Sequence, residues 1–171
     1  MSKPKTIGVV ISTYNNPAWL ENTLCGYLYQ TRPADEIVIA DDGSRDDTRQ
    51  LIDSFRPLLP IKHVWHEDKG FEKSRILNKA LLAAESEYLI FTDQDCVPRK
   101  DFIATHEAYA EEGYFLSGGY FKLPMDISKA LTQEDVSTER AFDLGWLKSQ
   151  GLKMNRRHYI LSGRKYIYRP V

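Results

Sequence analysis

The sequence lacks any hydrophobic run that could cross a membrane. None of its apolar stretches approaches the roughly 20 residues that a transmembrane helix needs. The first five residues lead directly into a strand-like run, so we expect no signal peptide and a cytoplasmic protein. At 171 residues the chain is long enough to form one domain with a sizeable core.

Cysteine is scarce, and several signature motifs are missing. Cys25 and Cys96 are the only cysteines, and they match neither a disulfide framework nor a zinc site. The four histidines show no metal-ligand spacing. No Gly-x-Gly-x-x-Gly follows the first strand-like run, and the sequence contains no P-loop and no nucleophile-elbow serine. These absences argue against an NAD-dependent enzyme and a P-loop ATPase.

Charge is nearly balanced overall but is unevenly distributed. The chain has 23 Lys and Arg residues against 24 Asp and Glu residues, yet no acid occurs from residue 153 onward. This basic tail can approach an anionic glycan, a diphosphate or an anionic membrane surface, and a solvated loop is the alternative. The tail lacks the clustered interleaving of basic and aromatic residues that would indicate nucleic-acid binding. Its six basic residues are Lys153, Arg156, Arg157, Arg164, Lys165 and Arg169.

Apolar strand-like runs alternate with helical segments over residues 1–119. The first run is rich in β-branched residues, which is typical of a strand buried on both faces of a parallel sheet. Asn16 with Pro17 predicts one helix start, and Ser44 with Asp47 predicts another. We therefore expect an α/β protein with a Rossmann-like, mainly parallel sheet and right-handed crossovers. The predicted strands are residues 6–12, 36–40, 61–65, 87–92 and 114–117, and the later predicted helices are residues 98–112 and 134–149.

Two carboxylates follow the fourth predicted strand. Asp93 and Asp95 would lie at the carboxyl edge of the sheet, where open α/β folds bind ligands. Mg²⁺ and Mn²⁺ prefer oxygen ligands, and one or two carboxylates together with a phosphorylated ligand can hold them. With 13 aspartates in the chain, roughly one such pair arises by chance, so its position carries the argument. The alternative is that Asp93 caps the next helix while Asp95 is merely solvated.

Polar groups also follow the first two predicted strands. Asp42 can accept a hydrogen bond from a nucleobase N–H, and the alternative is a turn with a helix cap. Ser12, Thr13 and Tyr14 end the first strand. Tyr14 can stack on a base, whereas the alternative is a packed aromatic residue in a polar turn. Because parallel strands bring their carboxyl ends to one edge, we expect Tyr14, Asp42 and Asp93 to meet there.

Cations cluster around the start of the third predicted helix. Lys69, Lys73 and Arg75 lie near the free N–H groups of a helix N-terminus, which makes a phosphate contact plausible. The alternative is a solvated helical face, because Glu67 and Glu72 are neighbours in the sequence. The sequence leaves both interpretations open.

The motifs, taken in order, resemble the signatures of glycosyltransferase family 2, whose members adopt the GT-A fold. The resemblance covers about residues 6–119, and several ordered motifs at the right intervals make it specific. The region after the third predicted strand, residues 66–71 and then 78–80, is similar to bacterial polysaccharide and lipopolysaccharide members. The segments that carry the resemblance are residues 9–15, 40–44, 66–71, 78–80 and 91–95.

The resemblance implies an inverting transfer from a nucleotide-diphosphate sugar, usually a UDP-sugar, to a glycan or lipid-linked acceptor. It implies a three-layer GT-A fold and a Mg²⁺ or Mn²⁺ ion that stabilises charge on the leaving nucleotide. Carried over by position, Ser12, Thr13, Tyr14, Asp42 and Asp93 would bind the nucleoside, Arg75 or Lys73 the phosphates, and Asp95 the metal.

The sequence departs from the family pattern in two places. Leu77 stands where the family usually has a basic residue, so Arg75 or Lys73 is the expected substitute. The family's catalytic base lies in a Gly-Trp-Gly-x-Glu-Asp-like segment, whereas here no acid follows Gly145-Trp146. The catalytic base is therefore not assigned.

We interpret the chain as an N-terminal, truncated portion of such an enzyme, with a fold incomplete at the C-terminus. Residues 1–119 would be the nucleotide-sugar-binding half, and residues 120–171 the start of the acceptor side of the same domain. Two other functions stay open. A sugar-nucleotide-binding module without turnover would also lack a base. A nucleotidyltransferase would also use metal-binding carboxylates, but no glycine-rich triphosphate loop is present.

Overall fold

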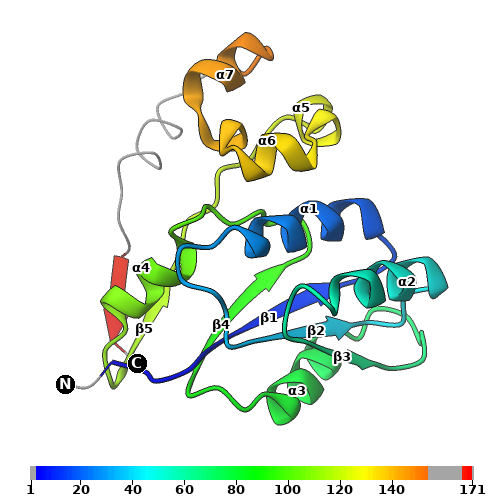
Figure 1. Ribbon diagram of the computed structural model, residues 1–171. Helices are drawn as coiled ribbons and strands as arrows, with labels where there is room; N and C mark the ends of the chain where they lie inside the picture. Colours follow the sequence, from blue (N-terminus) through cyan, green and yellow to red (C-terminus); the bar gives the residue numbers. More distant parts are fainter. Residues whose placement is uncertain (1–2, 154–166, 171) are drawn as a thin grey trace.

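The structure, a computed structural model, describes residues 3–153 and 167–170 (Figure 1). At its centre is a four-stranded parallel sheet with the strand order β3-β2-β1-β4. This arrangement confirms the predicted Rossmann-like α/β fold. The strands are β1 (Ile7–Thr13), β2 (Glu36–Asp41), β3 (Ile61–Trp65) and β4 (Tyr88–Asp93).

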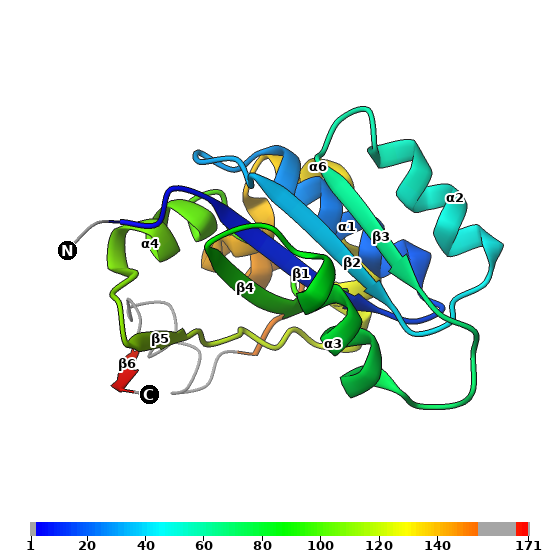
Figure 2. The ribbon, with the colours of Figure 1, turned by 90° about the horizontal axis from the view of Figure 1, so that it is seen from below.

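Helices cover both faces of the sheet. In Figure 1, α1 (Pro17–Leu28) and α2 (Asp46–Phe55) lie on one face. Figure 2 shows α3 (Lys73–Ala83) on the opposite face. The chain thus forms three layers, with the sheet in the middle.

The core is divided into two layers by the alternation of side chains along the strands. Val9 and Ile37 pack on the face covered by α1 and α2. Val10 and Val38 pack on the other face, against Ile76 of α3. Since successive residues of a strand point to opposite faces, a run that is apolar at every position supplies both layers.

The helix after β4 is shorter than the prediction of residues 98–112. It is α4 (Phe102–Tyr109). The carbonyl of Lys100 accepts a hydrogen bond of 2.8 Å from the backbone N–H of Thr31, in the connection between α1 and β2. The residues before α4 therefore bond to that connection rather than forming another helical turn.

The predicted strand at residues 114–117 is present, but its place in the parallel sheet is not. β5 (Tyr114–Ser117) pairs antiparallel with β6 (Ile167–Pro170) in a separate two-stranded sheet. Tyr114 and Phe115 are 43% and 47% exposed. The prediction that this strand continues the parallel sheet is therefore wrong, because its apolar side chains are not covered on both faces.

The single helix predicted at residues 134–149 is also wrong. Glu139 has φ of 60°, in the left-handed region, which interrupts the helix. Asp143 then starts a new helix by accepting a hydrogen bond from the backbone N–H of Trp146. The segment consists of α6 (Gln133–Ser137), the 3₁₀ turn η1 (Arg140–Phe142) and α7 (Leu144–Ser149), preceded by α5 (Met125–Ala130).

These short helices pack around their own small core and against α1. Ile127, Leu147 and Leu152 form that core. The Gln133 amide donates to the Glu21 carboxylate of α1 at 2.8 Å. In Figure 1 this group of helices lies above α1, on the far side from the sheet.

One predicted helix start is confirmed and the other is not. Asn16 occupies the N-cap position of α1 and Pro17 is its first residue. At α2 the N-cap position is taken by Arg45, and Ser44 does not form a capping box. Instead the Ser44 hydroxyl accepts a hydrogen bond of 2.9 Å from the backbone N–H of Asn15, which ties the loops after β1 and β2 together.

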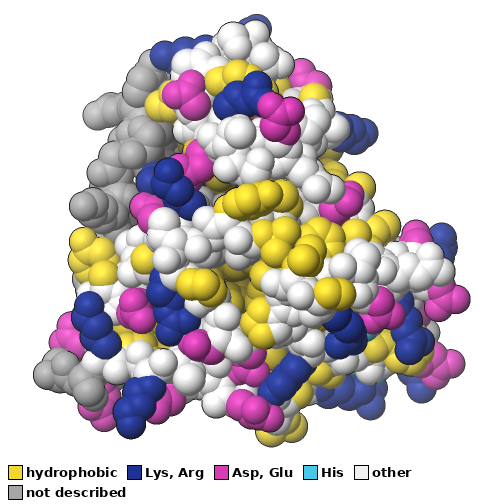
Figure 3. Space-filling view, in the orientation of Figure 1, with side chains coloured by type: hydrophobic (Ala, Val, Ile, Leu, Met, Phe, Trp, Pro, Cys, Tyr) yellow, Lys and Arg dark blue, Asp and Glu magenta, His cyan; other side chains and the backbone are white. Residues whose placement is uncertain are grey.

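No helix in the described part of the chain is both long enough and apolar enough to span a bilayer. On the face seen in Figure 3, hydrophobic side chains gather near the middle, and basic and acidic side chains are interspersed around them. The mixed signs on this face match the small net charge of the whole sequence.

A buried histidine makes the stability of the fold depend on pH. His106 of α4 is 4% exposed, its Nδ1 lies 3.0 Å from the Tyr88 hydroxyl, and its ring packs edge-on against Phe102. Burial lowers the pKa of His106 from 6.5 to about 4. The unfolded chain takes up this proton near pH 6.5, whereas the folded protein resists it until about pH 4. The stabilisation is therefore fully present above pH 6.5 and is lost as the pH falls toward 4.

We expect His106 to account for a loss of about 2.5 kcal/mol of unfolding free energy between pH 7.5 and pH 4.5. Urea denaturation of the wild-type chain and of His106→Gln at both pH values measures it. Carboxylates titrate alike in both proteins. The difference between the pH dependences of their unfolding free energies is therefore the contribution of His106. Equal pH dependence in the two proteins would contradict the prediction.

Candidate functional site

The carboxyl ends of β1 and β4 meet at one edge of the sheet. Ser12 is paired with Asp93 in the parallel register, and its hydroxyl donates a hydrogen bond to the Asp93 carboxylate. The backbone N–H of Gln94 donates to the Ser12 carbonyl at 3.0 Å. On the other side of β1, the N–H of Asp42 donates to the Thr13 carbonyl at 3.0 Å. The structure thus brings the predicted residues of three strand ends together.

Asp93 is held by a cation as well as by Ser12. The Lys73 ammonium forms an ion pair with the same Asp93 oxygen that accepts from Ser12. Partial burial alone would raise the pKa of Asp93, but hydrogen bonds from Lys73 and Ser12 and the Lys73 charge lower it below its usual value. Asp93 is therefore ionised at neutral pH.

Of the two expected phosphate-binding cations, only Lys73 contacts a predicted site residue. The Arg75 guanidinium is exposed and pairs with Glu72 one helical turn away, at 3.0 Å. This is the solvated helical face that the sequence left open for these residues. Lys73, by contrast, reaches the carboxyl edge of the sheet from the first turn of α3.

Asp95 is exposed and lies in the turn after β4. Within the described residues, its one hydrogen-bond contact is from the Cys96 thiol at 3.7 Å. A carboxylate in this position can bind a cation without first giving up a strong partner.

Gln94, between the two aspartates, shapes this turn, although it is not among the site residues predicted from the sequence. Its amide oxygen accepts hydrogen bonds from the Thr13 hydroxyl and from the Tyr14 backbone N–H, at 2.5 and 3.2 Å. Its backbone carbonyl accepts from the Thr23 hydroxyl at 2.6 Å. These bonds turn Gln94 inward and lock the β1 and β4 loops together. No sequence signal for this role exists beyond its position between two acids.

Asp42 is buried rather than open to solvent. It is 5% exposed, its Oδ1 lies 2.7 Å from His66 Nε2, and its Oδ2 accepts from the Glu72 backbone N–H at 3.1 Å. The preceding Asp41 is paired with His63 in the same manner, at 2.8 Å. The histidines show no ligand spacing in the sequence, and nothing in that spacing indicates that two of them serve as carboxylate partners.

The loop of residues 66–71 lies across the ends of β1 and β2. The Tyr14 hydroxyl donates to the Asp68 carboxylate at 3.0 Å, although Tyr14 itself is 47% exposed. A Cβ placed on Gly43 would lie 2.6 Å from Asp68 Cα, so the loop passes directly over the glycine. Phe71 follows in the same loop and is 89% exposed. Tyr14 therefore has the exposed ring that base stacking needs, as opposed to a packed one.

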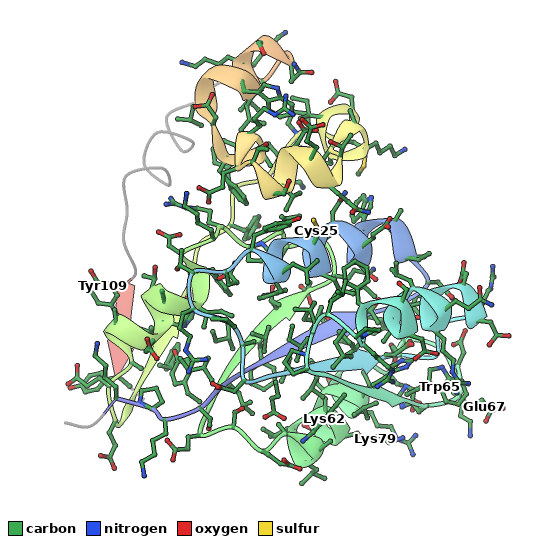
Figure 4. The ribbon with its side chains drawn as sticks, viewed as in Figure 1. Cys25, Lys62, Trp65, Glu67, Lys79 and Tyr109 are labelled. Atoms are coloured by element: carbon green, nitrogen blue, oxygen red, sulfur yellow. The ribbon has the colours of Figure 1, made fainter. Side chains whose placement is uncertain are left out.

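A hollow of about 350 Å³ lies beside this edge, between α2 and β3. None of the predicted site residues lines it. Figure 4 shows Trp65 and Glu67 at this end of the molecule, where β3 leads into the loop. The residues lining the hollow are Ser44, Asp46, Arg49, Arg56, His63 and Trp65.

The described residues contain no group of three or more His, Cys, Asp or Glu side chains arranged to hold a metal by themselves. An exposed Asp95 beside an ionised Asp93 fits a different kind of site. Mg²⁺ in particular is commonly held by one or two carboxylates, with phosphate oxygens and water completing its coordination. The chemistry of this donor set therefore fits a divalent cation that arrives with a phosphorylated ligand.

Comparison with known proteins gives sequence relatives, and also solved structures with this fold. Validoxylamine A glucosyltransferase of Streptomyces hygroscopicus subsp. limoneus is 40% identical over 89 residues, which are 51% of this chain and 20% of the relative. The mannosyltransferase PcManGT from Pyrobaculum calidifontis, solved with GDP-Man and Mn²⁺, is 28% identical with a TM-score of 0.56, over 66% of this chain and 34% of that one. S. aureus TarS 1-349, solved with UDP-GlcNAc, is 25% identical with a TM-score of 0.57, over 71% of this chain and 37% of that one.

The chain spans well under half the length of these proteins. Its solved neighbours are glycosyltransferases of the GT-A fold, which agrees with the fold expected from the sequence. The model of the family described as Glycosyl transferase family 2 matches residues 8–162, which is most of the sequence. On the strand-end motifs, the three-layer fold and this match, the chain belongs to glycosyl transferase family 2.

Proposed function

We propose that this chain is the donor-binding part of a metal-dependent, inverting glycosyltransferase that uses a nucleotide-diphosphate sugar, with UDP-sugars the first candidates. The acceptor would be a glycan or a lipid-linked glycan. The observation that carries the proposal is the joining of Ser12, Lys73 and Asp93 at the sheet edge, directly beside the exposed Asp95. Solved relatives that were crystallised with UDP-GlcNAc and with GDP-Man support a nucleotide-sugar donor.

The nucleoside would lie over the ends of β1 and β2. Tyr14 offers an exposed ring for stacking, and the backbone of Ser12 and Thr13 lines the same edge. Asp42 would accept from a base N–H, and Asp93 would face the ribose side of the nucleoside. In this arrangement each strand end contributes one part of the nucleoside contact.

Asp95, with Asp93 beside it, would hold the divalent ion. When bound, such an ion neutralises charge that develops on the leaving diphosphate. The protein's own contribution is positional: Gln94 fixes the turn that presents Asp95, and Ser12 keeps Asp93 oriented. Lys73 can exchange its Asp93 partner for a phosphate oxygen without leaving the site.

The proposal also assigns the donor and the acceptor to different parts of the chain. Residues 1–119 contain the parallel sheet and every proposed donor contact, whereas residues 120–171 would begin the acceptor side. We also propose that the protein acts in the cytoplasm, with the basic tail near an anionic glycan or membrane surface. Four of the six tail cations, Arg156, Arg157, Arg164 and Lys165, lie outside the described residues.

One observation keeps a second function open, namely a sugar-nucleotide-binding module without turnover. Gly145 and Trp146 lie within α7, and the next residue, Leu147, is buried in the small helical core. The sequence has no acid after Gly145-Trp146, in the position where the family's base is expected. A chain without that base could bind a sugar nucleotide without transferring the sugar.

Isothermal titration of UDP, GDP and UTP, each with Mn²⁺ and with EDTA, tests the proposal. We expect UDP to bind with Mn²⁺ and to bind much more weakly in EDTA. No UDP or GDP binding in the presence of metal would reject donor binding, and tighter binding of UTP than of UDP would favour a nucleotidyltransferase. Donor binding without transfer to any acceptor would identify the non-catalytic module.

The two cations of α3 provide a matched pair of variants. We expect Lys73→Gln to weaken UDP binding about tenfold, the loss typical of one charge-assisted hydrogen bond. Arg75→Gln should change it by less than about twofold, because Arg75 pairs with Glu72 on the surface. Uridine, which has no phosphate, should bind both variants equally well. An equal loss of UDP affinity in both variants would contradict the assignment of Lys73.

A further inference from the structure

Two adjacent carboxylates, each with its own histidine, distinguish the end of β2. The side chains of Asp42 and His66 are each 8% exposed and are joined by a hydrogen bond of 2.7 Å. Asp41 and His63 form the second pair, with side chains 1% and 7% exposed. Nearly complete burial means that neither carboxylate can rely on water, so each needs fixed donors.

A third residue determines which nitrogen of His66 carries the proton. The Lys79 ammonium lies 3.4 Å from His66 Nδ1. An ammonium group can only donate, so Nδ1 must accept. The imidazole proton is then on Nε2, which faces Asp42 Oδ1 and donates to it. The order of donation is Lys79 to His66 to Asp42.

The donated bonds fix the plane of the Asp42 carboxylate. His66 binds Oδ1, and the backbone N–H of Glu72 binds Oδ2. Rotation of the carboxylate about its Cβ–Cγ bond would break both bonds. Each oxygen still has a lone pair, so the carboxylate remains an acceptor with a defined direction.

We propose that His66 is a positioning residue for Asp42, and that Lys79 holds His66 in the donating tautomer, so that the site selects bases that present an N–H. Uracil has such a donor at N3, whereas cytosine has an acceptor there, which an oriented carboxylate repels. The inference rests on the proposed function, in which Asp42 contacts the base. It goes further by assigning base selectivity to a Lys79–His66–Asp42 series, whose members lie in α3, in the loop after β3 and in the turn after β2.

The His63–Asp41 pair is an internal control supplied by the fold. Asp41 has the same parity along β2 as Ile37 and Ile39, so it points to the α1 and α2 face, and its Oδ1 accepts from the Ser44 backbone N–H at 2.8 Å. This pair therefore stabilises the turn after β2 without contributing an acceptor to the proposed base site. Disrupting it should affect stability and leave base selectivity unchanged.

The tautomer can be tested without any ligand. In long-range ¹H–¹⁵N spectra of the wild-type chain at neutral pH, His66 should show protonated Nε2 and unprotonated Nδ1. In Lys79→Met the Nδ1–H form should become detectable, because the donor that excludes it is gone. A wild-type His66 protonated at Nδ1, or spectra that are identical in Lys79→Met, would overturn the proposed role of Lys79.

Selectivity is tested by titrating UDP, CDP and pyrophosphate, each with Mn²⁺, into matched variants. We expect His66→Asn to lower UDP affinity about tenfold and to leave pyrophosphate affinity unchanged. His66→Gln should recover most of the loss, because its amide nitrogen can occupy the place of Nε2. Lys79→Met should lower the preference for UDP over CDP about fivefold. His63→Asn should retain the wild-type preference.

The possible results distinguish a failure of the proposed base selectivity from a failure of the proposed nucleotide binding. A wild-type chain that binds no UDP rejects both. A wild-type chain that prefers UDP over CDP, with His66→Asn and Lys79→Met retaining the same preference, rejects the inference alone. Pyrophosphate binding verifies that each variant is folded at the metal site, and should His66→Asn not fold, His66→Gln and the exposed Lys79→Met still decide the question.

Discussion

Replacing Asp95 by asparagine should reduce the affinity for UDP in Mn²⁺ by about a hundredfold, down to the level that the wild-type chain shows in EDTA. Loss of a residue that merely supports a metal ligand costs up to about a hundredfold in metal affinity, so loss of a ligand itself should cost at least as much. Asp95 is exposed, and its one described hydrogen-bond contact is a weak one to the Cys96 thiol. The substitution should therefore change the unfolding free energy by less than about 0.5 kcal/mol.

Glu67→Gln is the matched control for charge. Glu67 is also an exposed carboxylate at this end of the molecule, and it pairs with Lys69. Titration calorimetry with UDP in Mn²⁺ should show the large loss for Asp95→Asn and almost none for Glu67→Gln. If both variants lose affinity equally, the carboxylates act only through general electrostatic attraction, and Asp95 is not a metal ligand.

The two central strands, β1 and β2, could be predicted from sequence because burial on both faces leaves a strong local signal. Residues 6–12 are apolar at nearly every position, and β1 is buried throughout. The later region gave no comparable signal. The backbone at Glu139 adopts φ of 60° within an otherwise helical pattern, and nothing in its neighbours announces that break. β5 has the composition of a strand, but its pairing with β6 joins segments some 50 residues apart.

The site was predictable only where the chemistry follows a strand end directly. Asp93 and Asp95 are visible in that way, because the order of the strands places their carboxyl ends on one edge. The partners of these groups come from elsewhere in the chain. Lys73 reaches Asp93 across 20 residues, and His66 reaches Asp42 across 24. Such contacts depend on how the loops pack, and no periodic pattern records them.

The close contact between Gly43 and the loop of residues 66–71 leads to the second large expected effect, a loss of stability. Gly43 has φ of 92°, and a Cβ added there would lie 2.6 Å from Asp68 Cα, which is backbone and cannot swing aside. Gly43→Ala should therefore destabilise the fold by about 3 kcal/mol, combining left-handed backbone strain with a steric clash. Any relief must lift the loop of residues 66–71, which carries His66 and the Asp68 partner of Tyr14. UDP affinity should fall for that reason as well.

The substitution Gly70→Ala distinguishes backbone strain from the steric clash. Gly70 has the same φ of 92°, but nothing lies within 4 Å of an added Cβ. It should show only the backbone strain, about 1 kcal/mol, so the difference of about 2 kcal/mol between the variants measures the contact between Gly43 and the loop. Urea unfolding curves of the two variants and the wild-type chain provide these values. Equal destabilisation by the two substitutions would mean that the loop yields freely, in which case it could not hold His66 against Asp42 firmly enough to orient the carboxylate.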